Sequence, residues 1–178
     1  MKQVFLTFAK HNQEANKTIA DILGKLTNDD REKDRKSYYK SLSELFRHNT
    51  GATAYFISLI KEAVPGNVEA QKAIASLSKI QELKGKLDEE KWKKAVGFSK
   101  IADKALVDFI NSLDDNDFQA PVKIEWYKGK PPSTPMWFML EQQVSHNIHH
   151  RGQISQILDS LKIDNDYSGI NIKFIHTT

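Results

Sequence analysis

The chain has 178 residues, of which 39% are hydrophobic and 28% are charged, the balance of a globular protein of one domain with a substantial core. It contains no cysteine, which excludes disulfides, thiolate metal ligands and a thiol nucleophile. The net charge is only +3, and the Lys-rich stretches are interleaved with Asp and Glu, so we expect solvated helix faces and no nucleic-acid partner.

The amino-terminal residues become polar too soon for a signal peptide, and no apolar run approaches the roughly 18 residues of a membrane span. We therefore expect a cytoplasmic protein without a membrane partner. Residues 3–26 are predicted to form a helix, because apolar residues recur there every three or four positions. Asn12 falls within this stripe, so its amide needs buried hydrogen-bond partners. The stripe consists of Val4, Phe8, Ala15, Ile19, Ile22, Leu23 and Leu26.

A second long helix is predicted after a charged connection, and it ends where Val64, Pro65 and Gly66 interrupt the pattern. His48 lies on the edge of its apolar stripe. The stripe consists of Tyr38, Leu42, Leu45, Ala52, Phe56, Leu59, Ile60 and Ala63.

Residues 67–84 predict a weaker, extra helix. Gly85 and the acidic run that starts at Asp88 then open a third strong helix, which ends in a second acidic run at residues 114–117. Its apolar stripe consists of Trp92, Val96, Ala102, Leu106, Phe109, Ile110 and Leu113.

Residues 121–128 alternate between apolar and polar side chains, as a short strand or hairpin arm does, and residues 128–132 predict a turn. Thr134 and Pro135 provide a capping hydroxyl and a first-turn proline, so the last helix is predicted to start there and to run to about Lys162. The remaining tail is expected to lie extended on the bundle through Ile170, Ile172 and Phe174.

Long amphipathic helices joined in this way predict an all-α fold. We expect a four-helix bundle with a short extra helix and a small extended or hairpin segment. The sequence shows no internal repeat and no low-complexity linker, so residues 1–178 are predicted to form a single domain.

Three of the six histidines fall within residues 146–150, in the last helix. The helical period places His146 and His150 together at the edge of the apolar face, and His149 on the polar side. The apolar face is predicted to consist of Trp137, Leu140, Val144, Ile148, Ile154, Leu158 and Leu161. Two histidines four residues apart can hold one metal ion, and a third ligand must then come from elsewhere.

His48 becomes that third ligand if the second and fourth helices are neighbours. Three imidazoles leave an open position on the ion, which is the pattern of a catalytic site. For zinc, such a site brings the pKa of bound water to about 7. The alternative is that these histidines are half-buried packing residues. A zinc-protease site is excluded, because Asn147 follows His146 where that chemistry needs Glu.

Four residues next to the histidine pair carry further expectations. Asn147 and Arg151 project into the apolar face, so Arg151 is expected to act as a buried strut bonded to a carboxylate or to helix-end carbonyls. Gly152 is expected to permit close approach of a neighbouring element. Gln153 points to the side of the histidine pair, either as the partner that orients one imidazole or as a solvated residue.

At these residues the chain resembles the DinB/YfiT-like family of helical-bundle metalloproteins. That family carries a His late in helix 2, matched by His48, and a His-x-x-x-His-Arg-Gly-Gln segment in helix 4, matched by residues 146–153. Its helix 1 often carries Asn-x-x-x-Asn, matched by Asn12 and Asn16. The resemblance extends over nearly the whole chain in helix order.

The resemblance implies a four-helix bundle of unusual connectivity, a divalent metal (zinc or nickel) held by His48, His146 and His150, and a homodimer. Family members with a known activity are S-transferases and an isomerase that use low-molecular-weight thiols. A small-molecule substrate and a small thiol cosubstrate are therefore implied. This sequence departs from the family by its extra segment at 67–84, which is expected to reshape the mouth of the site, and by His11, where an aromatic residue is common.

Three functions follow as hypotheses. The first is a metal-dependent S-transferase that activates a small thiol on the ion. The second is a metal-assisted hydrolase with the same ligands. The third is a non-enzymatic bundle for metal binding or stress-related interaction, which is favoured by one observation: beyond the ligands, the sequence places no Glu, Asp or Tyr at the site, so the catalytic residues are unknown.

Overall fold

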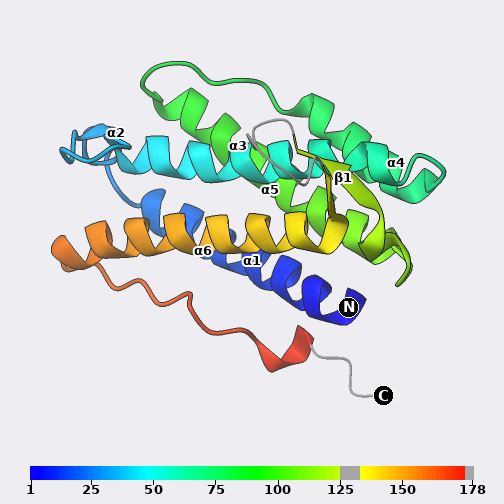
Figure 1. The fold of residues 1–178 in the computed structure, drawn as a ribbon. Coiled ribbons are helices and arrows are strands. Elements are labelled where there is room, and N and C mark those ends of the chain that lie inside the picture. The colour runs from blue at the N-terminus through cyan, green and yellow to red at the C-terminus, as the bar shows by residue number, and fades with distance from the viewer. Residues whose placement is uncertain (125–132, 175–178) are drawn as a thin grey trace.

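A computed structural model describes residues 1–124 and 133–174 of the chain (Figure 1). Four long helices form a bundle. In the chain, one short helix precedes the second long helix and another follows it, and two short strands pair before the last long helix. In chain order the elements are α1 (Lys2–Leu23), α2 (Asn28–Glu32), α3 (Leu42–Ile60), α4 (Val68–Ala75), α5 (Glu89–Ser112), β1 (Pro121–Lys123), β2 (Ser133–Pro135) and α6 (Met136–Ser160). The expected all-α bundle with an extra helix and a small hairpin is confirmed.

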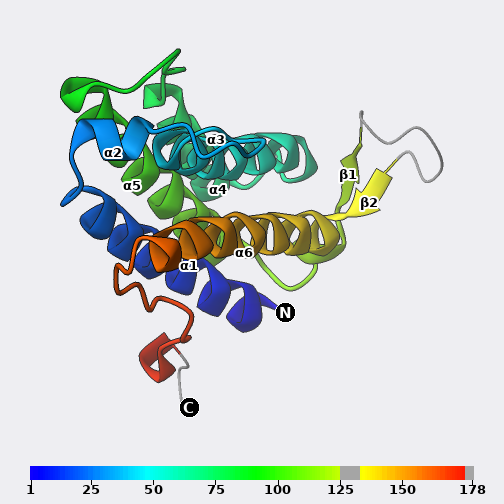
Figure 2. The same ribbon diagram turned by 90° about the vertical axis from the view of Figure 1, so that its left-hand side faces the viewer.

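The long helices surround a shared centre in the order α1, α5, α3, α6. Helix α5 packs against α1 and α3, and α6 packs against α3 and, less extensively, against α1. Helix α4 lies outside α5, and the antiparallel pair β1–β2 stands at one end of the bundle (Figure 2). Helices α3 and α6 are therefore direct neighbours, which is the condition for His48 to approach the histidines of α6.

Side-chain caps fix where two of these helices begin. Ser41 Oγ accepts from the Glu44 backbone N–H at 3.1 Å, while Glu44 Oε2 accepts from the N–H of Lys40, one residue before the cap, at 3.0 Å, a variant of the capping box. Asp88 caps α5 through the Lys91 N–H at 2.8 Å. The expected cap at Thr134 is wrong: Thr134 is held in β2 opposite Val122, and α6 begins at Met136 without a side-chain cap.

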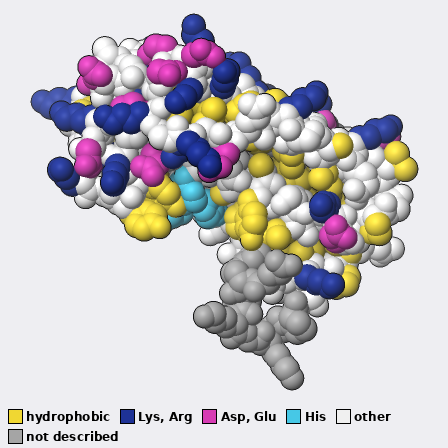
Figure 3. All heavy atoms as spheres, turned by 90° about the horizontal axis from the view of Figure 1, so that it is seen from above, with side chains coloured by type: hydrophobic (Ala, Val, Ile, Leu, Met, Phe, Trp, Pro, Cys, Tyr) yellow, Lys and Arg dark blue, Asp and Glu magenta, His cyan; other side chains and the backbone are white. Residues whose placement is uncertain are grey.

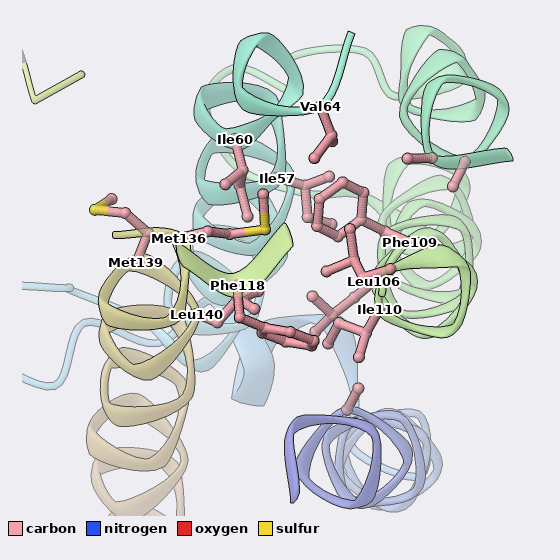
Figure 4. Close-up of a cluster of buried hydrophobic side chains, with 14 of the residues drawn as sticks. Ile57, Ile60, Val64, Leu106, Phe109, Ile110, Phe118, Met136, Met139 and Leu140 are labelled. Atoms are coloured by element: carbon pink, nitrogen blue, oxygen red, sulfur yellow. The ribbon is translucent and has the colours of Figure 1, made fainter. Parts of the chain in front are cut away.

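The interior divides into two apolar clusters, one toward each end of the bundle. Figure 4 shows the first, where side chains from α3, α5 and α6 meet around Phe109 and Phe118. The second cluster lies at the end where α1 finishes and α3 begins. Its buried members are Ile19, Ala20, Leu23, Leu42, Leu45, Phe46, Leu87, Trp92, Ala95, Ile154 and Leu158.

Between the two apolar clusters lies a polar layer, formed by buried side chains from the middle of each long helix. Its members are Asn12 and Asn16 of α1, Asn49 and Thr53 of α3, Ser99 and Asp103 of α5, and Gln143, Asn147 and Arg151 of α6. A buried polar group is costly unless it is hydrogen-bonded, so these residues must satisfy one another.

Asp103 is the acceptor at the centre of the polar layer. Its Oδ1 accepts from Asn12 Nδ2 at 2.8 Å and from Asn16 Nδ2 at 2.9 Å, and its Oδ2 accepts from Ser99 Oγ at 3.3 Å. Burial raises the pKa of Asp103 to about 7, and the hydrogen bonds and the charge of Arg151 act in the opposite direction. The prediction that Asn12 needs buried partners is confirmed.

Arg151 reaches this carboxylate through an amide. Its guanidinium donates to Asn12 Oδ1, which also accepts from Asn147 Nδ2 at 2.8 Å. Asn12 thereby relays between the cation and Asp103. Arg151 is buried as predicted, but its hydrogen-bond partner is the Asn12 amide, and neither a carboxylate nor a helix-end carbonyl accepts from it in the described part of the chain.

Four residues assigned to apolar stripes are exposed. Val4 is 57% exposed, Tyr38 89%, Ile148 51% and Leu161 37%. Tyr38 precedes α3 and so has no place on that helix. On α6 the centre of the buried face, which includes Asn147 and Arg151, is as predicted, but Ile148 and Leu161 lie at its edges and face solvent.

Other local expectations hold in part. The extra helix stops at Ala75, followed by a 3-10 turn over Ser76–Lys79. The extended segment is confirmed only as Pro121–Lys123, and the rest of the predicted arm and turn, residues 125–132, lies outside the described residues. No neighbouring element approaches Gly152 closely, because a Cβ there would meet nothing within 4 Å.

The end of the described tail rests on α1, where Lys173 pairs with Glu14. Gln3 Nε2 donates to the Phe174 carbonyl at 2.9 Å, and Phe174 is buried. Ile170 and Ile172 are exposed, so these two do not pack on the bundle as expected. Across the described residues, no helix combines the length and apolar character that crossing a membrane requires.

We predict that Asp103→Leu lowers the free energy of unfolding by about 3 kcal/mol, because it leaves the Asn12 and Asn16 amide donors without their shared acceptor and removes the charge that balances buried Arg151. Asp108→Leu on the same helix is the matched control. Asp108 is exposed and makes a surface ion pair with Lys104 at 2.6 Å, so its loss should cost about 0.5 kcal/mol or less. Denaturant unfolding followed by circular dichroism measures both, and equal effects would contradict the importance of the polar layer.

Candidate metal centre

The three histidines singled out from the sequence meet between α3 and α6. His48 Nε2 lies 3.1 Å from His146 Nε2 and 3.2 Å from His150 Nε2, and the latter two lie 3.2 Å apart. Each of the three residues offers one ring nitrogen, and these nitrogens lie close enough together to hold one metal ion. We refer to them as the histidine cluster.

These distances fit a metal ion without movement of the rings. With metal–nitrogen bonds of about 2.0–2.1 Å, two nitrogens on one tetrahedral zinc ion lie about 3.3 Å apart. The separations of 3.1 and 3.2 Å in the cluster are close to that value. Three imidazoles that meet on one side of a point also leave its opposite side for another ligand.

The register of α3 against α6 brings the cluster together. Thr53 Oγ1 accepts from Asn147 Nδ2 at 3.1 Å and from Gln143 Nε2 at 3.3 Å, while its own hydroxyl donates to the Asn49 carbonyl at 3.2 Å. All three contacts lie within about one turn of the histidines. The polar layer thus holds the two helices at the height where His48 faces the α6 pair.

Gln153 orients one of the imidazoles. Its Oε1 lies 2.7 Å from His150 Nδ1, and because an amide oxygen only accepts, Nδ1 carries the proton and Nε2 turns its lone pair to the cluster. Of the two roles expected for Gln153, the structure supports the partner of an imidazole. His149 is exposed, as predicted, and its ring lies edge-on to that of His150 with the centroids 4.9 Å apart. His146 Nδ1 is buried without a hydrogen-bond partner among the described residues.

The surroundings keep the cluster neutral. Burial lowers the pKa of His48 to about 4, and the positive charges that His150 and His146 would carry act in the same direction. Burial, followed by the charge of His150, lowers the pKa of His146 to about 4. Burial also lowers the pKa of His150, and the hydrogen bond that His150 donates to Gln153 acts in the opposite direction. At neutral pH all three are unprotonated imidazoles, the form that binds metals.

A tyrosine that sequence reasoning missed also reaches the cluster. Tyr39 Oη lies 2.8 Å from His48 Nε2. The sequence alone placed no Tyr at the site, and the tertiary structure brings one there. A signal was available: the capping pair Ser41 and Glu44 starts α3 after Tyr39, so this residue belongs to the preceding connection and is free to fold back.

A groove of about 1200 Å³ opens beside the cluster. This α3 groove is lined by the outward side of α3 together with Tyr39, residues 80–85, Phe98, Gln142 and His146. Both His48 and His146 line it, so the cluster is reachable from outside. Figure 3 shows histidine side chains at this face between hydrophobic side chains. The segment at 67–84, which was expected to reshape the mouth of the site, forms part of the groove wall through Ile74, Leu77 and residues 80–84.

Fold and site together define a class: a four-helix bundle with a three-histidine cluster between two helices, beside an open groove. The chain matches the DinB family over residues 1–161, and it therefore belongs to the DinB family. The match ends one residue after α6, so the tail lies beyond it. No curated protein matches the chain.

We predict a pH-dependent stability for the metal-free protein that His48 helps to set. The pKa of His48 is about 4 in the fold and about 6.5 in the unfolded chain, so below pH 6.5 only the unfolded chain takes up the proton. This contribution is fully present above pH 6.5 and is lost as the pH falls toward 4. Allowing for partial exposure, His48→Gln should reduce the loss of stability between pH 7.5 and 5 by about 1 kcal/mol.

His149→Gln provides the control for this measurement, since it makes the same substitution at an exposed position of α6 outside the cluster. Asp103 titrates in the opposite sense, because its pKa is raised in the fold, but it does so in every variant and cancels in the comparison. Denaturant unfolding in the presence of a chelator gives the free energies. Identical pH dependence in wild type and His48→Gln would contradict the lowered pKa.

Proposed function

We propose that this chain is a divalent-metal-dependent enzyme, with S-transfer from a small thiol as its reaction and zinc or nickel as its metal. His48, His146 and His150 are the proposed ligands. The observation that carries the proposal is the meeting of three Nε2 atoms within 3.1–3.2 Å of one another beside an open groove. A divalent ion held there supplies one effect: it acidifies a bound thiol, which becomes a thiolate nucleophile near neutral pH.

The chain's own residues perform the remaining tasks. The three imidazoles stay neutral at pH 7 because they are partly buried, and Gln153 fixes the ring of His150. The protein has no cysteine, so the sulfur that reacts must come from a cosubstrate. The α3 groove gives a small molecule access to the cluster.

The α3 groove also favours substrates with an apolar part. Hydrophobic side chains of α3, α5 and the segment after α4 line it, among them Phe56, Phe98, Leu77 and Ile80. Burial of such a substrate against these side chains would provide binding energy of about 25 cal/mol per Å² of apolar surface removed from water. An electrophile of this kind, held with its reactive atom at the cluster, is the substrate class we propose.

Two further features belong to the same proposal. We place the enzyme in the cytoplasm, on the absence of cysteine, with small molecules and no nucleic acid as partners. We also propose a homodimer, as the family resemblance implies. Size-exclusion chromatography with light scattering tests the dimer, and a binding titration with duplex DNA at low salt tests the exclusion of nucleic acid.

We predict that the purified protein contains about one divalent ion per chain, because three convergent neutral imidazoles form one site. The triple variant with His48, His146 and His150 changed to Ala should contain less than a tenth of an ion per chain, by analogy with the large losses that follow removal of ligands. His149→Ala should retain full occupancy, since His149 is exposed and lies outside the group of three histidines whose nitrogens converge. Mass spectrometry of the metal content measures all three. Full occupancy in the triple variant would end the proposal.

The reaction type needs a separate experiment, since a hydrolase would use the same ligands. We predict that the metal-loaded protein consumes apolar electrophiles only when a small thiol is added, and that the triple variant does not. Mass spectrometry of the products distinguishes the thiol adduct from the hydrolysed electrophile. Consumption without thiol would identify a hydrolase, and no consumption under either condition would favour the non-enzymatic, metal-binding function.

A further inference from the structure

Tyr39 brings a phenol hydroxyl to the histidine cluster from the connection between α2 and α3. Its oxygen lies 2.8 Å from His48 Nε2. Its ring centroid lies 4.4 Å from that of His48, with the planes 30° apart, and 5.2 Å from that of His150, which it meets edge-on. The tyrosine therefore contacts ligand candidates on both helices of the site.

The position of this hydroxyl is fixed by contacts away from the cluster. The capping box of α3 holds the chain directly after Tyr39, as Glu44 accepts from the Lys40 N–H at 3.0 Å. Ser37 Oγ donates to the Tyr39 carbonyl at 2.5 Å, and Arg35 N–H donates to the Lys40 carbonyl at 2.6 Å. The ring also packs against the second apolar cluster. The hydroxyl thus belongs to a preformed arrangement.

Tyr39 stands on the open side of the cluster. Together with His48 and His146 it lines the α3 groove, the direction from which an external ligand arrives. Among the described residues, His48 Nε2 is the one hydrogen-bond partner of the hydroxyl. A His48 nitrogen that donates its lone pair to an ion can no longer accept this hydrogen bond. The hydroxyl is then available to another acceptor at the same place.

We propose that Tyr39 is the hydrogen-bond donor to the anionic ligand that enters the open side of the metal centre, the sulfur of the thiol cosubstrate in the reaction. This inference rests on the proposed function, and it adds a substrate-contacting residue to the three ligands. No covalent step passes through Tyr39. The phenol keeps its proton and donates a hydrogen bond to the anionic ligand, which stabilises the negative charge on that ligand.

Cobalt(II)-loaded protein provides a direct test, because the visible bands of the ion report both its binding and the arrival of an external ligand. The probes are azide and 2-mercaptoethanol, each titrated into wild type, Tyr39→Phe and Tyr38→Phe. The Tyr39→Phe variant keeps the ring of Tyr39 and removes only its hydroxyl. We expect it to bind both anions about tenfold more weakly, the effect of one lost hydrogen bond to a charged acceptor. Its affinity for cobalt should stay within about twofold of wild type.

Tyr38→Phe is the matched control, since it removes a hydroxyl from the exposed neighbouring ring and should match wild type throughout. Unchanged azide and thiol affinities in Tyr39→Phe would overturn the role of Tyr39 and leave the proposed function standing. A large loss of cobalt affinity would overturn it as well, because Tyr39 would then be a ligand of the ion. Failure of the wild type to bind cobalt would instead overturn the proposed function, and the role of Tyr39 with it.

Discussion

The structure depends on the register of α3 against α6, which is held by hydrogen bonds within the protein interior. Thr53 accepts from Gln143 and Asn147, and Asn147 also donates to Asn12, which bonds to Asp103. Apolar contacts tolerate small sliding of one helix along another, whereas a buried hydrogen bond is lost by a shift of about 1 Å. The polar layer therefore fixes the relative height of the helices, and with it the meeting point of three imidazoles.

This layer makes the site possible at a cost in stability. Apolar residues of similar volume would often stabilise a bundle as well as a buried ion pair does. Here Asp103 and Arg151 are separated by Asn12, so each charge is satisfied by amides as well as by the opposite charge. Arg151 immediately follows His150 in the chain, so the residue that anchors α6 in the layer also sets the rotation of the helix at the cluster.

The two sides of the histidine cluster have different characters. On the interior side, Gln153 and burial keep the imidazoles oriented and neutral. On the outer side, the α3 groove opens past Tyr39 and the segment that follows α4. The ligands belong to the part of the chain that resembles the DinB family most strongly. Part of the groove wall comes from the extra segment, through Ile74, Leu77 and residues 80–84, so the shape of the groove depends on residues outside the shared motif.

The order of the helices and the candidate ligand residues could be predicted from the chain. The spacing of His146 and His150 by four residues places them together on any helix, and the stop at residues 64–66 separates the elements correctly. The centre of the buried face of α6, with Asn147 and Arg151, was also predictable, whereas its edge was not, because Ile148 faces solvent despite its hydrophobicity. Asp103 occupies a position of the apolar repeat of α5, and this position was the sequence signal for a buried carboxylate.

The sequence by itself determined the elements, since helical periodicity, capping residues and proline breaks act over a few neighbouring positions. It also determined which histidines can share an ion from one helix. Only the tertiary structure decided that His48 lies opposite the histidine pair of α6, and that Tyr39 folds back onto the cluster. It also decided that residues 80–85 line part of the groove. Each of these contacts joins positions far apart in the chain, so it is set by packing and by buried hydrogen bonds between helices, and no local pattern encodes it.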